Sequence, residues 1–166
     1  MHGSPPKDYP KNILMEYFSL HFRLQAMTGP AHDIMENKFK ELDLNLRSWP
    51  RNEQNDPFFS ASHDLAQQLG KITRLEVLVG FNEFCNPSLD NAFAEAVQKG
   101  AEKIIVVTPM MTPGGEHSEK DIPEAISRIQ KQAPNLKIHY AWPFDMSEVA
   151  KFLADNIDRT MSIDQK

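Results

Sequence analysis

The chain has 166 residues, of which 40% are hydrophobic and 25% are charged, and its formal net charge is -5 at pH 7. This length predicts one domain, and the composition is that of a globular protein rather than of a disordered chain. The acidic balance argues against nucleic-acid partners, the single cysteine (Cys85) excludes an internal disulfide, and the lack of a long apolar run or signal peptide predicts a cytoplasmic protein with no membrane partner.

The first third of the chain has the pattern of helices. Apolar residues recur at helical spacing after Pro10, at Ile13, Leu14, Tyr17, Phe18 and Leu24. They recur again at Met35, Phe39, Leu42 and Leu46. Asp56 followed by Pro57 predicts the start of a third helix, because aspartate is a favoured N-cap and proline is favoured at the first helical position.

Strands and helices alternate in the rest of the chain. Apolar, partly β-branched runs at 75–81, 104–107 and 136–141 predict three strands, the second of them buried, with helices between and after them. This alternation predicts an α/β fold in which a small parallel sheet carries helices on both faces, as a three-layer sandwich. A strand directly before His2 would complete the sheet, and we expect that it is missing or lies outside the numbered chain.

The loops after the predicted strands contain the residues most able to carry chemistry. Ligands of parallel sheets bind beyond the carboxyl ends of the strands. Glu83 and His117 follow two predicted strands, and His2 would follow the absent one, so we expect these three side chains to meet at one edge. Two imidazoles and a carboxylate suit Co, Ni, Fe or Zn and leave coordination positions open for a substrate.

Plainer interpretations stay open at this point. A lone histidine in a loop is most often exposed and idle, and Glu83 could simply cap the helix that follows it. The idle interpretation applies more strongly to His21, His32, His63 and His139. Gly114-Gly115 could form a backbone site for an anion, and Cys85 has the character of a small buried residue.

Four segments resemble the sirohydrochlorin chelatases, the small class II chelatases of the CbiX and SirB type. Residues 114–123 (GGEHSEKDIP) resemble the family's G-x-H signature followed by D-I-P, and residues 83–89 (EFCNPSL) resemble its E-x-x-x-P-S-L element. Residues 104–111 look like the strand that precedes the histidine loop, and residues 2–4 (HGS) look like the H-G-S motif that ends the family's first strand. On this resemblance, residues 1–166 form a single chelatase-like domain with a helical insertion at about 28–56.

The resemblance implies a lyase that inserts a divalent metal into sirohydrochlorin and releases two protons, as in cobalamin or siroheme biosynthesis. Co²⁺ is the first choice of metal substrate, Ni²⁺ and Fe²⁺ are the others, no organic cofactor is implied, and a homodimer is expected. The implied roles are metal ligand or proton acceptor for His2 and His117, and third catalytic group for Glu83. The alternative is a carrier of the same fold that binds metal or tetrapyrrole without turnover.

The expected substrate predicts two further kinds of contact. Sirohydrochlorin carries many carboxylates, so basic side chains should line the site, and the candidates are Lys7, Lys11, Arg47 and Arg51. The flat face of the macrocycle should pack on aromatic side chains, for which the candidates are Phe81, Phe84, Trp142 and Phe144.

Overall fold

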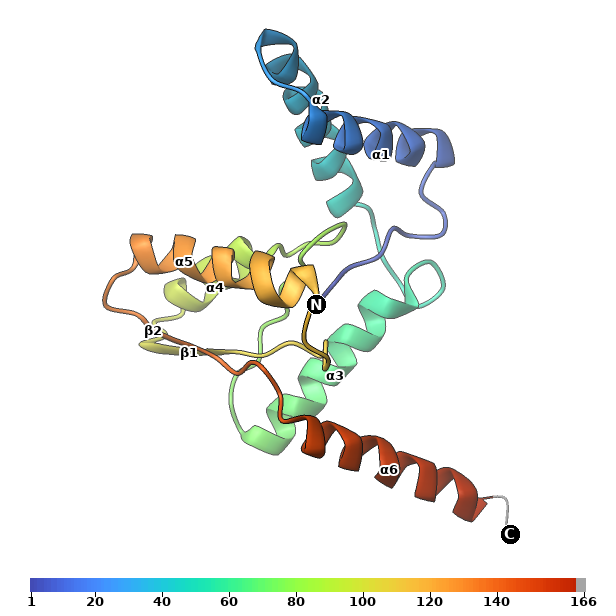
Figure 1. The fold of residues 1–166 in the computed structure, drawn as a ribbon, viewed down its shortest axis with the longest axis vertical. Coiled ribbons are helices and arrows are strands. Elements are labelled where there is room, and N and C mark those ends of the chain that lie inside the picture. The colour runs from blue at the N-terminus through green and yellow to red at the C-terminus, as the bar shows by residue number, and fades with distance from the viewer. Residues whose placement is uncertain (164–166) are drawn as a thin grey trace. The chain divides into compact units, whose positions relative to one another are not determined.

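The computed structural model describes residues 1–163. The elements in chain order are α1 (Lys11–Ala26), α2 (Pro30–Arg47), α3 (Pro57–Thr73), α4 (Leu89–Gln98), β1 (Lys103–Val106), the π-helical turn η1 (His117–Asp121), α5 (Ile122–Gln132), β2 (Lys137–Tyr140) and α6 (Met146–Ile163) (Figure 1). They fall into two compact units, Met1–Gln98 and the part from Lys99 onward. The α/β class and the small parallel sheet predicted from the sequence are confirmed.

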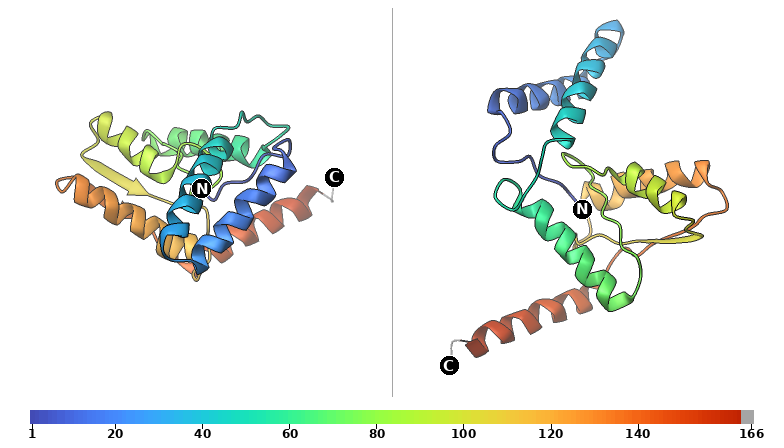
Figure 2. Two further views of the ribbon diagram at one scale, coloured as in Figure 1. Left: turned by 90° about the horizontal axis from the view of Figure 1, so that it is seen from above. Right: turned by 180° about the vertical axis from the view of Figure 1, so that it is seen from behind.

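Three of the helices of the first unit, α1, α2 and α3, lie where the sequence predicts helices. α1 and α2 pack against each other (Figure 2). α3 starts at the predicted cap, because the Asp56 carboxylate accepts a hydrogen bond from the Phe59 backbone N–H at 3.0 Å and Pro57 occupies the first helical position. The core of this unit combines residues of α1, α2 and α3 with residues of the loop segments, namely Tyr9, Tyr17, Leu42, Leu46, Ala66, Val79, Phe81, Phe84 and Cys85.

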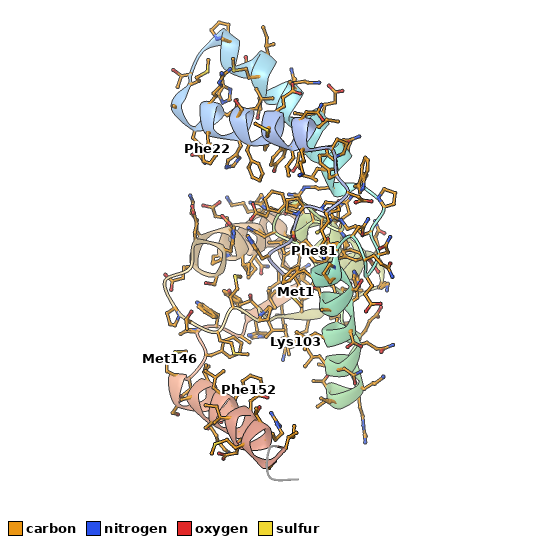
Figure 3. All side chains as sticks on the ribbon, turned by 90° about the vertical axis from the view of Figure 1, so that its right-hand side faces the viewer. Met1, Phe22, Phe81, Lys103, Met146 and Phe152 are labelled. Carbon is orange, nitrogen blue, oxygen red and sulfur yellow. The ribbon has the colours of Figure 1, made fainter. Side chains whose placement is uncertain are left out.

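The prediction of a strand over residues 75–81 is wrong in its extent, because the structure assigns no strand there. Pairing is confined to the end of the segment. The Met1 nitrogen donates to the Gly80 carbonyl at 2.7 Å, and the Asn82 N–H donates to the Met1 carbonyl at 2.9 Å. This is the hydrogen-bond pattern of two parallel strands, and it brings Met1 beside Phe81 (Figure 3). The apolar sequence of residues 75–81 favours a strand, but a strand forms only where a neighbouring strand supplies hydrogen-bond partners along its length.

The second unit is built around the parallel pair β1 and β2. Lys103 is in register with Lys137 and Val106 with Tyr140. The amphipathic helix α5 packs on β2 (Figure 1). Three of its apolar residues are buried (Ile122, Ala125 and Ile129), and so is Leu136, directly before β2. The burial predicted for the strand at 104–107, which corresponds to β1, is only partial, because Ile105 remains 52% exposed. Along both strands, half-buried residues alternate with exposed ones, so only one face of this two-stranded sheet is covered.

The large apolar side chains of the last helix, α6, lie at the surface. None of the described residues of α6 is buried, and Phe152 is 52% exposed (Figure 3). Within residues 1–163, no helix combines the length and the apolar character needed to cross a membrane.

Candidate functional site

In the first unit, the histidine of the H-G-S motif and the glutamate of the E-x-x-x-P-S-L element lie side by side. His2 Nδ1 is 3.0 Å from Glu83 Oε1, and the two side chains are 48% and 28% exposed. The backbone holds the pair in register, since the Glu83 N–H donates to the His2 carbonyl at 3.0 Å. The Phe84 and His2 rings lie edge-to-face, with 6.3 Å between centroids. Within this unit, His2 and Glu83 therefore lie together, as the sequence predicts.

Gly3 explains why the small residue of the H-G-S motif stands beside this histidine. Its φ is +116°, a conformation that side chains other than hydrogen disfavour. A Cβ atom at this position would overlap the Glu83 carbonyl oxygen. The chain can pass this close to the loop that carries Glu83 only where the residue has no side chain.

Arg47, at the end of α2, binds the backbone of the same loop. Its Nη1 donates to the Cys85 carbonyl at 3.0 Å, and its Nη2 donates to the Asn82 carbonyl at 3.2 Å. Its Nε donates to Asp43 Oδ2 at 2.7 Å. The guanidinium thus has carbonyl partners on both sides of Glu83 along the chain.

Arg51 forms a buried ion pair with Asp56, and the two side chains are only 3% and 1% exposed. Its Nη1 also donates to the Ser4 carbonyl at 2.8 Å, and its Nη2 donates to the Phe84 carbonyl. This corrects the expectation that Arg51 lines the site to receive substrate carboxylates, because a side chain buried to this degree cannot face a solvated ligand. Lys7 and Lys11 are exposed.

In the second unit, the predicted histidine has a carboxylate partner that the sequence analysis did not assign. His117 Nδ1 lies 2.5 Å from Asp121 Oδ2, and the side chains are 28% and 31% exposed. The two residues are the ends of η1, four positions apart, a spacing that brings side chains to the same face of a helical turn. The signal was present in the sequence, because Asp121 is the aspartate of the D-I-P element.

The loop before His117 is closed on itself and tied to β2. The Gly114 N–H donates to Glu119 Oε1 at 2.6 Å, so a carboxylate of the chain itself takes the N–H that an anion site at Gly114-Gly115 would use. Ser118 is fully buried, and its carbonyl accepts a hydrogen bond from the Tyr140 hydroxyl at 2.9 Å. The turn that carries His117 is thereby fixed to the end of the sheet.

Aromatic side chains lie at the end of β2 and directly after it. The rings of Tyr140 and Trp142 are stacked with 6.2 Å between centroids, and Phe144 meets Trp142 edge-on at 5.7 Å. Trp142 and Phe144 are half-buried. Of the other two aromatic candidates, Phe81 is 0% and Phe84 is 8% exposed, so both belong to the core and not to a surface for a macrocycle.

Cys85 is fully buried, as predicted, and burial raises the pKa of its thiol, which keeps it in the less nucleophilic protonated form. A second group that could hold a metal ion consists of His32, Asp33 and Glu36 at the start of α2, whose ligand atoms lie within 4.8 Å of one another. Exposed acidic groups are common without a metal ion, and this one lies outside the motif segments.

The chain belongs to the CbiX family, whose family model matches residues 51–160, more than half of the chain. A sirohydrochlorin ferrochelatase of Priestia megaterium is 29% identical over 49% of this chain and 31% of its own length. A sirohydrochlorin cobaltochelatase of Methanopyrus kandleri is 33% identical over 38% of this chain and 42% of its own length. Another cobaltochelatase, from Saccharolobus islandicus, is 32% identical over 49% of this chain and 68% of its own length. The match with the Priestia protein thus spans about a third of that relative.

Solved structures of a chelatase show a partial likeness. The sirohydrochlorin chelatase SirB from Bacillus subtilis subspecies spizizenii, in complex with cobalt, is 26% identical over 51% of this chain and 36% of its own, with a TM-score of 0.42. SirB from Bacillus subtilis with Fe³⁺ is 31% identical over 51% of this chain and 34% of its own, with a TM-score of 0.41.

Proposed function

We propose that this chain is a sirohydrochlorin metal chelatase, an enzyme that inserts a divalent metal into the macrocycle. Membership of the CbiX family supports this proposal, as do the names of its ferrochelatase and cobaltochelatase relatives. The observation that carries it is chemical: each of the two motif histidines, His2 and His117, has a carboxylate on Nδ1.

A carboxylate on Nδ1 decides which nitrogen of the imidazole does the chemistry. With Nδ1–H donating to the carboxylate, the lone pair of the neutral imidazole is on Nε2. Nε2 can then bind a metal ion or accept a proton. We assign the metal ligands to His2 and His117, the orienting carboxylates to Glu83 and Asp121, and we keep Glu83 as the third catalytic group.

The reaction needs both properties of these imidazoles. A divalent ion that enters the macrocycle replaces two pyrrole N–H protons, so charge balances only when two protons leave. In the proposed sequence the imidazoles hold the ion, release it to the macrocycle nitrogens, and then accept the protons. Trp142 and Phe144 are proposed to contact the ring face, and Lys7 and Lys11 to bind its carboxylates, because all four remain at least partly exposed.

The replacement His117→Ala tests the proposal. Loss of a metal ligand and proton acceptor should lower the rate of Co²⁺ insertion by about 100-fold or more, without loss of folding. The rate is followed by the absorbance change of sirohydrochlorin, and folding by circular dichroism. The matched control is His139→Ala, since His139 is an exposed histidine of the same unit, on β2.

Two results would contradict this proposal. Insertion by the His117→Ala variant at the parental rate would remove His117 from the site. Tight binding of sirohydrochlorin by the parent protein, without faster metal insertion than in buffer, would instead support the carrier function. Binding of Co²⁺ alone, measured in a His32→Ala background that removes the separate group on α2, should weaken when either His2 or His117 is replaced by alanine.

The choice of metal and the assembly state are parts of the same proposal. We propose Co²⁺ as the preferred substrate over Ni²⁺ and Fe²⁺, to be compared at equal free metal under anoxic conditions. The relatives include both cobalto- and ferrochelatases, so both ions need to be assayed. The homodimer and the cytoplasmic location stay predictions, and light scattering coupled to size exclusion tests the first.

A further inference from the structure

We propose that Arg47 is a positioning residue for the His2–Glu83 pair, and that it acts by holding the loop of residues 82–85 against the end of α2. Its effect on catalysis rests on the proposed function, whereas its effect on the loop does not. The proposal also assigns a task to the helical segment predicted as an insertion, residues 28–56, because Arg47 is the last residue of its helix.

The two carbonyls that Arg47 binds lie on either side of Glu83 in the sequence. The residue before Glu83 accepts a hydrogen bond from Nη2, and the residue after next, Cys85, accepts one from Nη1. Both donors belong to one planar group, so they fix the orientation of the intervening peptides as well as their distance. The side chain is 16% exposed, which places these bonds largely out of competition with water.

The loop has a backbone conformation that needs such support. Phe84 has a φ of +61°, in the left-handed region that residues with a side chain adopt at a free-energy cost. The Cys85 N–H donates to the Glu83 carbonyl at 2.7 Å, which closes a tight turn centred on Phe84. Arginine side chains bind the carbonyls around this turn, because Arg47 donates to those of Asn82 and Cys85 and Arg51 donates to that of Phe84.

Arg47 is itself anchored. Asp43, one helical turn earlier on α2, accepts from Arg47 Nε at 2.7 Å and from the Tyr17 hydroxyl at 3.2 Å. Tyr17 is 4% exposed, so the carboxylate is fixed from a buried position on α1. A continuous set of hydrogen bonds thus runs from α1 through α2 to the loop that carries Glu83.

An arginine near a polycarboxylate substrate has a competing interpretation, which is direct binding of a substrate carboxylate. The two roles predict different behaviour of Arg47→Lys. Lysine keeps the positive charge that a carboxylate needs, but it lacks the planar fork that reaches Asn82, Cys85 and Asp43 together. A positioning role therefore predicts that lysine fails almost as badly as glutamine, whereas a binding role predicts that lysine substitutes.

The first measurement is steady-state kinetics of Co²⁺ insertion by the full chain and its Arg47→Lys and Arg47→Gln variants. We expect both variants to lower kcat by about tenfold or more, with KM for sirohydrochlorin within about twofold of the parent. The control is Lys40→Gln on the same helix, whose ammonium group pairs with Glu36 at 3.1 Å on the exposed surface, and it should leave both constants unchanged. A lysine variant with parental kcat, together with a glutamine variant that changes only KM, would overturn the proposal.

The second measurement does not depend on activity. Hydrogen exchange of the Glu83 and Cys85 amides, both hydrogen-bonded in the structure, reports how firmly the loop is held. Exchange should be faster by about tenfold or more in both Arg47 variants and unchanged in Lys40→Gln, at equal melting temperature. Unaltered exchange would contradict the inference whatever the activity. A parent protein that inserts no metal, with faster exchange in the variants, would refute the proposed function and leave the positioning role standing.

Discussion

At the scale of single residues, the approach of His2 to Glu83 depends on a glycine. Gly3 combines a positive φ with a carbonyl oxygen where its side chain would be. The motif residues His2, Glu83 and His117 were predicted from the sequence, because their types and the resemblance single them out. Asp121 and Arg47 were not assigned these roles, because a sequence does not show which carboxylate or guanidinium a folded chain brings to a given atom.

Replacement of Gly3 by alanine separates the two reasons for this glycine. Gly29 also has a positive φ, +93°, but a Cβ there would meet nothing within 4 Å. Both Gly3→Ala and Gly29→Ala should lose about 1 kcal/mol of unfolding free energy from backbone strain. Only Gly3→Ala should lose more than that and also lower the rate of metal insertion, as measured by urea unfolding and the absorbance assay. Equal losses in the two variants would show that the contact with Glu83 has no consequence.

At the scale of elements, helices were predicted well and one strand was not. The signals for α1, α2 and α3 are local, since apolar periodicity, proline and an N-cap residue all act within a few positions. A strand depends on partners far away in sequence. Residues 75–81 have suitable side chains, but within residues 1–163 the recorded pairing is limited to Met1 and Ser88 at the end of the segment.

The start of α3 depends on a residue with two tasks. Asp56 caps the helix through Phe59 N–H and is also the buried partner of Arg51. In Asp56→Asn the amide oxygen can still cap, because asparagine is as good an N-cap as aspartate, but the buried guanidinium loses its counter-charge. We expect a loss of about 3 kcal/mol or more of unfolding free energy, measured by urea denaturation. Asp64→Asn, an exposed position on the same helix, should change it by less than about 0.5 kcal/mol.

If the loss in Asp56→Asn is no larger than in the Asp64 control, the ion pair with Arg51 contributes nothing to stability. A loss of metal insertion without a loss of stability would instead indicate that the pair acts on the loop alone, because Arg51 also binds the Ser4 and Phe84 carbonyls.

At the scale of the whole molecule, the tyrosines make the stability of the fold depend on pH. Burial raises the pKa of Tyr9, Tyr17 and Tyr140, and Tyr17 is further affected by Asp43. The chain has three tyrosines, so none is left with an ordinary pKa. The unfolded chain releases these phenolic protons near pH 10, at a lower pH than the folded chain does.

Stability should therefore fall as the pH rises above about 10, because the folded state holds more protons than the unfolded state in that range. Below that pH the contribution of these groups is fully present. Absorbance at the tyrosinate band should show no ordinary tyrosine titration in the folded protein and three in guanidinium chloride. A tyrosine of the folded protein that titrates near pH 10 would contradict the burial described for it.

The sequence by itself determined the helices, the α/β class and the residue types of the site, because propensity, periodicity and short motifs are properties of neighbouring residues. Only the tertiary structure decided that His2 pairs with Glu83, that Asp121 pairs with His117, and that Arg47 and Arg51 bind backbone carbonyls of the Glu83 loop. It also decided that Phe81 and Phe84 belong to the core. These outcomes depend on contacts between residues distant in sequence and on burial, which a guanidinium or a phenyl ring acquires only when the chain has folded around it.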